Sequence, residues 1–477
     1  MRFRIRRLSE VLAACLCAAG LFAATSSVGG ASASLSSDAA VAQPLSQATS
    51  AAGAAPAAGS PVSVVAPASS ASAAPPTAVE AGDASDGDPN DDEALPRDRY
   101  VDDAVPAGLG ALLDGFDPRV HSLEGEQLVS PLDGGSRAVL TLHPGLQAHV
   151  EARFREYEVP YGAVVAIEPS SGRVLAYVSH SSRNPRGGDL VLDATPPTAS
   201  VFKVVTGAAL IDAGVSEDTR VCYHGGGSGL NLGHLADDRA RDSSCATLSD
   251  AMGGSINAVF AKLADRHLDP STVTRYASAF AWGQRVPFDI PVRPSPAEVP
   301  TDRLEFARTT AGFWHMHMSP LHGALIAATI ANDGQMPRAA VVQRVLSGSG
   351  ESVYQHAPSN YRAVLSRRTA RRVGEMMERT VSHGTARRSF FDNNGNAFLP
   401  GIRIAGKTGT LTGSDPYRGY TWWVGFAPAD APTIAVAALV VNDPAWRVKA
   451  SYMARETLRY YLVEAPRVAA GSPTRGD

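Results

Sequence analysis

The composition of residues 8–96 limits where this chain can fold. This stretch contains no Lys or Arg, residues 23–99 contain no aromatic residue, and the acidic side chains gather over 80–93. A segment made mainly of Ala, Ser, Pro and Gly cannot bury enough apolar surface to offset the entropy lost on ordering. We therefore expect a disordered tether over residues 34–96 and a folded part that begins near Arg97.

The N-terminus carries the features of an export signal. Four arginines in the first seven residues precede an apolar run over residues 11–24, and small residues follow at 31–33. This order is typical of a secretory signal, and the run is short for a transmembrane helix. We expect residues 1–33 to be a signal peptide or an uncleaved anchor in the inner membrane. The folded part would then lie in the cell envelope or periplasm.

The charge balance excludes one large class of function. The chain has 43 Lys and Arg residues against 47 Asp and Glu residues, for a net charge of −4, so no basic excess attracts nucleic acid. Only four of these cations are lysines, namely Lys203, Lys262, Lys407 and Lys449. Arginine does not release its proton in proteins, whereas a lysine amine can. A lysine in this chain is therefore a candidate for acid–base chemistry.

The pattern of the folded part predicts an α+β protein. Strands are expected near both of its ends and helices mostly between them, which favours an antiparallel β-sheet flanked by helices plus a mainly helical subdomain. We expect a short linker or small N-terminal extension over residues 97–137, one domain over 138–463 and a disordered tail over 464–477. The expected strands cover 138–142, 162–167, 173–178, 402–405, 421–426 and 433–441, and the expected helices 146–157, 201–213, 320–332 and 450–462.

Ser200-Val-Phe-Lys203 lies where a loop gives way to one of the expected helices. Side chains at positions i and i+3 share a face of a helix, so the hydroxyl and the amine can meet. A serine is a poor nucleophile until a base takes its proton, and a desolvated lysine amine can be that base at neutral pH. Ser-x-x-Lys also occurs by chance, as an N-cap serine above a surface lysine, so the motif needs support.

Two further motifs give that support. Ser255-Ile-Asn257 opens an expected helical run, and Lys407-Thr-Gly-Thr410 lies at the expected end of a strand. The second motif joins a cation to Gly409, whose missing side chain lets an extended ligand lie against the strand edge. Together the motifs predict a site for nucleophilic catalysis on an extended, anionic substrate.

In this order, Ser200-x-x-Lys203, Ser255-x-Asn257 and Lys407-Thr-Gly409 resemble the three motifs of penicillin-binding proteins and serine β-lactamases. The likeness runs from about residue 138 to 463 and implies a transpeptidase-type domain with the penicillin-binding protein/β-lactamase-like fold. Similar stretches are also found at 162–176, 318–334 and 383–386.

The resemblance implies roles for the motif residues. Ser200 would attack the D-Ala-D-Ala carbonyl of a peptidoglycan stem peptide, and Lys203 would be its base. Ser255 would relay a proton to the leaving group. The backbone N–H groups of Ser200 and Thr410 would form the oxyanion hole.

The same resemblance assigns substrate binding to other motif residues. Asn257 would hold the substrate amide, and Lys407 and Thr408 would bind its carboxylate. The expected ligands are peptidoglycan stem peptides and β-lactam antibiotics, with no cofactor and no metal.

The resemblance leaves the exact activity open. A D,D-transpeptidase, a D,D-carboxypeptidase, a serine β-lactamase and an inactive penicilloyl-binding sensor share these motifs. No Glu-x-x-x-Asn segment between Ser255 and Lys407 suggests the deacylating water of a β-lactamase. Only about forty residues separate the tether from residue 138, too few for a glycosyltransferase domain, so we expect a separate glycan polymerase as a partner.

A second class of function competes for Lys407. Gly401-Ile-Arg-Ile-Ala-Gly406-Lys407-Thr408 fits the phosphate-binding pattern G-x-x-x-x-G-K-[ST] of nucleotide hydrolases. That loop must run from a strand into a helix whose N-terminus binds phosphate. Here the intervening residues alternate as a strand, and a Gly- and Pro-containing loop is expected after Lys407. We therefore treat a nucleotide hydrolase as the less favoured interpretation.

Cys222 and Cys245 remain in the exported part of the chain. In an oxidising compartment a disulfide between them is the favoured interpretation, and it would stabilise the fold by roughly 3 kcal/mol. Together with His224 and His234 they could instead supply four zinc ligands, although the spacing lacks the usual clustering. Two buried free thiols are the third possibility.

Overall fold

The computed structural model describes residues 104–227, 229–414 and 416–469. The expected export signal (1–33) and tether (34–96) lie outside this part of the chain. Within the described residues, no helix combines the length and the hydropathy that crossing a bilayer requires.

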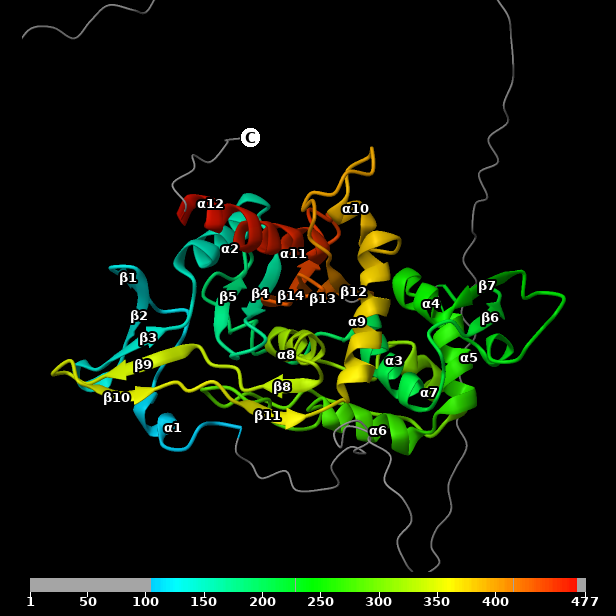
Figure 1. Cartoon of the computed structure of the whole chain (residues 1–477), viewed down its shortest axis with the longest axis horizontal. Coiled ribbons are helices and arrows are strands. Elements are labelled where there is room, and N and C mark those ends of the chain that lie inside the picture. Colours follow the sequence, from blue (N-terminus) through cyan, green and yellow to red (C-terminus); the bar gives the residue numbers. More distant parts are fainter. Residues whose placement is uncertain (1–103, 228, 415, 470–477) are drawn as a thin grey trace, which may run out of the picture. The chain divides into compact units, whose positions relative to one another are not determined.

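A five-stranded sheet lies at the centre of the fold (Figure 1). Its strand order is β12-β13-β14-β4-β5, and every neighbouring pair is antiparallel. The expected strands near the two ends of the folded part thus meet where β14 pairs with β4, as an α+β layout requires. The bounds are β4 Tyr161–Ile167, β5 Val174–His180, β12 Ala405–Ser414, β13 Tyr417–Ala427 and β14 Ile434–Asn442.

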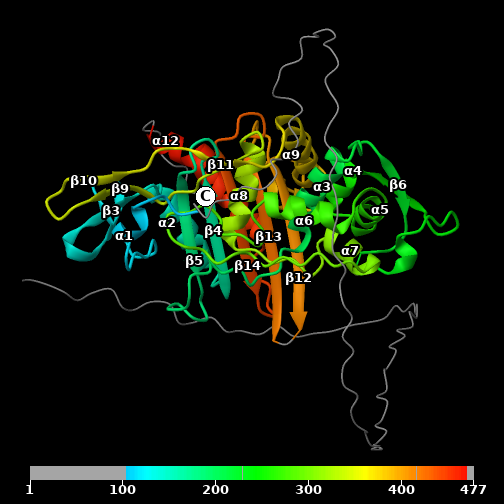
Figure 2. The same cartoon turned by 90° about the horizontal axis from the view of Figure 1, so that it is seen from below.

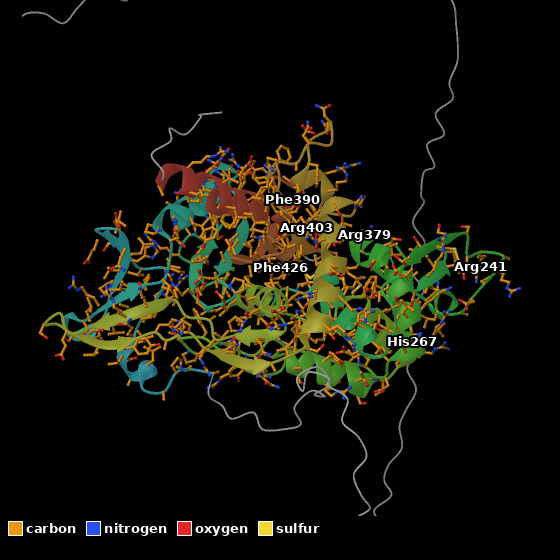
Figure 3. All side chains as sticks on the ribbon, viewed as in Figure 1. Arg241, His267, Arg379, Phe390, Arg403 and Phe426 are labelled. Carbon is orange, nitrogen blue, oxygen red and sulfur yellow. A yellow bond between two sulfur atoms is a disulfide. The ribbon has the colours of Figure 1, made fainter. Side chains whose placement is uncertain are left out.

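Both faces of this sheet are buried because successive side chains of a strand point to opposite faces. Val165 on β4 belongs to one hydrophobic core, and Val164 belongs to the other. The same division separates Phe426 on β13 from Phe390, which lies across the sheet (Figure 3). Helix α8 covers the first face, and α2 and α11 cover the second. Their bounds are α2 Pro144–Glu156, α8 Pro320–Ala331 and α11 Ala450–Arg459.

Local signals explain where these helices begin. Ser319 caps α8 by accepting a hydrogen bond from the His322 N–H at 3.2 Å, and Pro320 occupies the first helical position. His143 caps α2 in the same way, again before a proline. The expected helices at 146–157 and 320–332 are confirmed within a few residues.

A mainly helical subdomain packs beside β12, as expected. Helix α3 contacts α4, α5, α6 and α9, so it forms the centre of this subdomain. A two-stranded sheet of β6 and β7 lies at its outer side, where Arg241 stands at the tip (Figure 3). The bounds are α3 Lys203–Asp212, β6 Arg220–Tyr223, β7 Ser244–Thr247, α4 Leu248–Gly254, α5 Asn257–His267, α6 Pro270–Ala279, α7 Arg303–Thr310, α9 Arg367–Ser382 and α10 Arg387–Phe390.

A second five-stranded sheet lies at the opposite end of the central sheet from this subdomain (Figure 2). Its order is β1-β2-β3-β9-β10, so part of the expected extension 97–137 pairs with a segment some two hundred residues later in the chain. The bounds are α1 Leu109–Leu112, β1 Ser122–Glu124, β2 Gln127–Pro131, β3 Arg137–Leu140, β8 Gln335–Pro337, β9 Val342–Leu346, β10 Ser352–Gln355 and β11 Asn360–Ala363, with β8 and β11 forming a separate pair.

Two expectations about the C-terminal part were wrong. The strand expected at 402–405 begins only at Ala405 and continues to Ser414, because its backbone pairs with β13 over this whole length. The tail expected from residue 464 is still helical up to Ala469, through the π-helical turn η4 (Tyr460–Glu464) and α12 (Ala465–Ala469).

Candidate active site

Ser200 lies in a tight turn held by backbone packing. The turn is a 3₁₀ segment, η2 (Ala199–Phe202), which leads directly into α3. Ala199 has a φ of 52°, a conformation that is strained for a residue with a Cβ. Gly312 lies so close beneath the turn that a Cβ on it would stand 2.8 Å from Ser200 Cα. The position of the Ser200 side chain is therefore set by contacts between main chains.

Lys203 is fully buried and lies against three polar atoms. Its Nζ is 2.9 Å from Ser200 Oγ and 2.8 Å from Asn257 Oδ1, and it also donates to the carbonyl of Ala311. A neutral amine has two N–H donors and one lone pair. The Asn257 and Ala311 oxygens can accept both donors, which leaves the lone pair facing the Ser200 hydroxyl.

The electrostatic surroundings favour this neutral form. Burial lowers the pKa of Lys203 well below its usual value, and the nearby charge of Lys407 lowers it further. Both effects disfavour the ammonium, because it loses hydration and meets a like charge. Lys203 can therefore act as a proton acceptor at neutral pH, as its position in the sequence motif predicts.

Asn257 begins α5 and turns its carboxamide in a defined direction. Its Oδ1 faces Lys203, while its Nδ2 donates to the carbonyls of Gly226 and Gly227 at 3.2 Å each. Ser255, between α4 and α5, has a left-handed φ of 55°. On either side of this bend, Ser255 contacts Lys407 and Asn257 contacts Lys203.

Lys407 connects β12 to Ser255. Its amine is buried and donates to Ser255 Oγ and to the carbonyl of Thr408, both at 2.9 Å. Burial lowers the pKa of Lys407 to about 7. The hydroxyl of Thr408 is hydrogen-bonded to that of Thr385. The amine of Lys407 and the hydroxyls of Ser255, Thr408 and Thr385 thus lie together at β12.

Gly409 allows β12 to approach the turn that carries Ser200. A Cβ on it would lie 3.1 Å from Ala199 Cβ and 3.2 Å from the carbonyl oxygen of Thr198, tighter than most such contacts. Thr410 follows on the same strand and is exposed. Because β12 is the outermost strand of the central sheet, an extended ligand could lie along it beside Ser200.

Comparison with known proteins shows the family of this chain. The family model of the penicillin binding protein transpeptidase domain matches residues 162–459. The chain belongs to this family. It is similar to the peptidoglycan D,D-transpeptidase PbpA of Mycobacterium tuberculosis (strain ATCC 25618 / H37Rv), with 29% identity over 72% of this chain and 75% of that protein. It is also similar to the stage V sporulation protein D of Bacillus subtilis, with 23% identity over 73% of this chain and 56% of that protein.

Solved structures of penicillin-binding proteins share the fold. The imipenem acyl-enzyme complex of penicillin-binding protein A from M. tuberculosis superposes with a TM-score of 0.57 and 26% identity, covering 68% of this chain and 79% of that one. The penicillin G acyl-enzyme complex of the same protein gives a TM-score of 0.56 at 25% identity, covering 68% and 80%. The expected family and the expected α+β fold are both confirmed.

The transpeptidase domain brings together most of the residues that the motifs singled out. Hydrogen bonds connect Ser200, Lys203 and Asn257 in one group and Ser255 with Lys407 in another. Three contributors escaped the motif analysis: the carbonyl of Ala311, the close packing of Gly312 and the hydroxyl of Thr385. Only Thr385 had a signal, because it belongs to the 383–386 stretch. The residue type at position 311 does not indicate what its carbonyl will contact. A glycine at position 312 does not indicate which turn it will pack against.

The position of Lys407 corrects one prediction and argues against the nucleotide-hydrolase interpretation. The Lys407-Thr-Gly409 motif lies inside β12 rather than at the end of a strand. After Lys407 the backbone stays extended up to Ser414, and no helix N-terminus follows it there. The phosphate-binding interpretation of residues 401–408 therefore lacks the structure it requires.

Cys222 and Cys245 are joined to each other. Cys222 on β6 and Cys245 on β7 form a disulfide between paired residues of the two strands. Their thiols are therefore not free to bind zinc, and no cluster of His, Cys, Asp and Glu suited to a metal occurs among the described residues. His224 contacts Asp242 instead, at 2.5 Å.

Proposed function

We propose that this chain is a serine D,D-transpeptidase that acts on D-Ala-D-Ala stem peptides of peptidoglycan and is acylated by β-lactams. The observation that carries the proposal is the buried Lys203 amine, 2.9 Å from Ser200 Oγ and with acceptors for both of its N–H groups. Membership of the transpeptidase family and the names of the relatives support the same activity.

Acylation begins at Ser200. Its Oγ attacks the carbonyl carbon of the penultimate D-Ala while the hydroxyl proton passes to Lys203. The N–H groups of Ser200 and Thr410 stabilise the oxyanion, typically by ~3 kcal/mol for each donor. Ser255 then passes its hydroxyl proton to the leaving amine and is reprotonated by Lys407, which donates to its Oγ at 2.9 Å. The C–N bond breaks and leaves an ester on Ser200.

Substrate binding falls to the groups around β12. Lys407 and Thr408 bind the terminal carboxylate. Asn257 Oδ1 uses its second lone pair, beside the one that faces Lys203, to accept the N–H of the substrate amide. The pKa of Lys407 is lowered to about 7 by burial, so an incoming carboxylate favours its ammonium form. In the second half of the reaction an amine of a neighbouring stem peptide attacks the ester and gives up a proton through Ser255 to Lys407. Lys203 returns its proton to Ser200, so the cross-link forms and the serine is freed.

The N-terminal features complete the proposal. Residues 1–33 export the chain and could retain it at the membrane, and residues 34–96 form a tether that lets the domain reach the cell wall. The domain lies in residues 138–463 and receives its glycan strands from a separate polymerase. The support for this part of the proposal is the composition of the N-terminal residues. Four arginines precede an apolar run at 11–24, and residues 34–96 contain no Lys or Arg.

The experiment is to incubate the purified protein with a fluorescent penicillin and follow both labelling and release of the label. We expect wild type to be labelled stably and Ser200→Ala to remain unlabelled. Equal labelling of the two proteins would refute the acyl-serine mechanism. Rapid release of label would indicate a β-lactamase, and release of D-Ala from a stem peptide without cross-linking would indicate a carboxypeptidase.

A further inference from the structure

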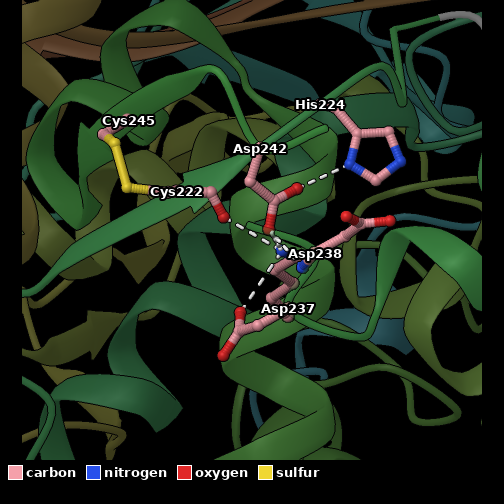
Figure 4. The surroundings of a disulfide bond; sticks show 7 residues. Cys222, His224, Asp237, Asp238, Asp242 and Cys245 are labelled. Atoms are coloured by element: carbon pink, nitrogen blue, oxygen red, sulfur yellow. Dashed lines mark hydrogen bonds and ion pairs between the residues drawn. A yellow bond between two sulfur atoms is a disulfide. The ribbon is translucent and has the colours of Figure 1, made fainter. Parts of the chain in front are cut away.

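One segment outside the motifs is tied to the active site by a chain of contacts. Residues 220–247 leave the helical subdomain on β6 and return on β7, and the Cys222–Cys245 disulfide joins the two strands (Figure 4). The part just after β6 contains the run Gly225-Gly-Gly. Glycines have no side chains with which to hold such a loop in place, so its conformation depends on what fixes its ends.

Lys262 fixes one end of this loop to α5. The side chain is fully buried, and its ammonium donates to the Cys222 carbonyl at 3.0 Å and to Asp242 Oδ2 at 2.6 Å. The other oxygen of Asp242 contacts His224 Nδ1 at 2.5 Å (Figure 4). An ammonium this deep in the protein requires such partners. The disulfide and this buried ion pair therefore hold the chain at residues 222 and 224.

The loop held in this way presents its carbonyls to Asn257. Gly226 adopts a φ of 76° and packs on α5 so closely that a Cβ would lie 2.9 Å from Ala258 Cβ. The carbonyls of Gly226 and Gly227 accept both N–H groups of the Asn257 carboxamide. A flipped carboxamide would set its oxygen against these two carbonyls and its N–H groups against the amine of Lys203. The loop thus selects the orientation in which Oδ1 faces Lys203.

We propose that Lys262 and the Cys222–Cys245 disulfide form a positioning device that orients Asn257, and through it the Lys203 base. The inference rests on the proposed acyl-serine function and adds residues that never touch the substrate. Lys262 is one of four lysines in the chain, and this contact explains why a compact, buried cation is placed on α5. Asn257 is the element through which the device acts.

The test is a double-mutant cycle on the rate of acylation by a fluorescent penicillin. The proteins are wild type, the Cys222→Ser/Cys245→Ser variant, Asn257→Ala, and the variant that combines all three changes. We expect removal of the disulfide to slow acylation at least tenfold in the wild-type background and to have no further effect once Asn257 is alanine. A purely stabilising disulfide would lower the rate by the same factor in both backgrounds.

A second pair of variants keeps the disulfide intact, in case its removal prevents folding. Gly226→Ala forces the loop away from Ala258, and we expect it to slow acylation by a similar factor, again only when Asn257 is present. Gly229→Ala is the matched control in the same loop, because a Cβ there meets no atom within 4 Å, and we expect it to match wild type.

The outcomes separate the two proposals. A wild-type protein that takes up no label would overturn the acyl-serine function and this inference with it. Normal labelling of wild type together with equal rate losses in both backgrounds, or with no loss in either variant, would overturn the positioning role alone.

Discussion

Replacing Lys203 by arginine tests the chemistry of the site, because it keeps a long basic side chain but exchanges a titratable amine for a permanently charged guanidinium. The amine that is replaced is fully buried and stands 2.9 Å from Ser200 Oγ and 2.8 Å from Asn257 Oδ1. A guanidinium at this place has no lone pair to accept the Ser200 proton, and it does not deprotonate at accessible pH. The variant therefore removes the proton acceptor and places a permanent cation against the same neighbours.

The expected loss follows from the role of a general base. Proton transfer to a positioned side chain is worth about 10²- to 10⁴-fold in rate, or about 3 to 5 kcal/mol. A permanent charge at position 203 would also lower the pKa of Lys407 below its present value of about 7, since the two cations repel each other. We expect acylation of Lys203→Arg to be slower by about a thousandfold, with the larger effect on substrates that carry a carboxylate.

The assay is the time course of labelling with a fluorescent penicillin, with a thermal melt of each protein beside it. Lys449→Arg is the matched control, because this exposed lysine lies over the ring of Trp446, away from the motifs. We expect the control to be labelled like wild type. A Lys203→Arg variant that melts like wild type and is acylated within tenfold of its rate would refute the role of Lys203 as base. If that variant does not fold, Lys203→Met tests the same point.

Two further substitutions test the packing and the titration of buried groups. Gly409→Ala brings a Cβ to 3.1 Å from Ala199 Cβ, so β12 must shift away from the Ser200 turn. We expect roughly tenfold slower acylation in the labelling assay. An unchanged rate would contradict this packing. Asp289 is buried, which raises its pKa to about 7, and one of its oxygens accepts the Val341 and Val342 N–H groups at 2.7 and 2.8 Å. A raised pKa means that the folded state binds the extra proton, so the free energy of unfolding should fall by up to about 4 kcal/mol between pH 4 and 8. Chemical denaturation measures this free energy at each pH, and Asp289→Asn should show no such fall. An equal pH dependence of the two proteins would show that Asp289 does not cause it.

Much of the fold could be predicted from local signals. The hairpin 162–178, the helix after Ser319 and the strands at 421–426 and 433–441 follow from residue periodicity and from capping or turn residues. The extent of β12 could not be predicted in this way, because Gly406, Gly409 and Gly413 interrupt the strand preference of the threonines between them. Pairing with β13 and packing against the Ser200 turn keep that segment extended.

The candidate site, like the fold, could be predicted from the sequence only in part. The spacing of Ser200 and Lys203 brings hydroxyl and amine together through helical geometry alone, so the sequence by itself determined this pair. It also predicts that the folded part begins after residues 34–96, because a segment made mainly of Ala, Ser, Pro and Gly offers too little apolar surface to bury.

Only the tertiary structure decided what the pair can do. The acceptors for Lys203 come from Asn257 and from the carbonyl of Ala311, both distant in sequence, and the orientation of Asn257 depends on the loop tied to Lys262. The sequence motif specifies an amine, but its proton affinity depends on burial and on neighbouring charges. Those are properties of the packed chain, because desolvation and Coulomb interactions act between groups that only folding brings together.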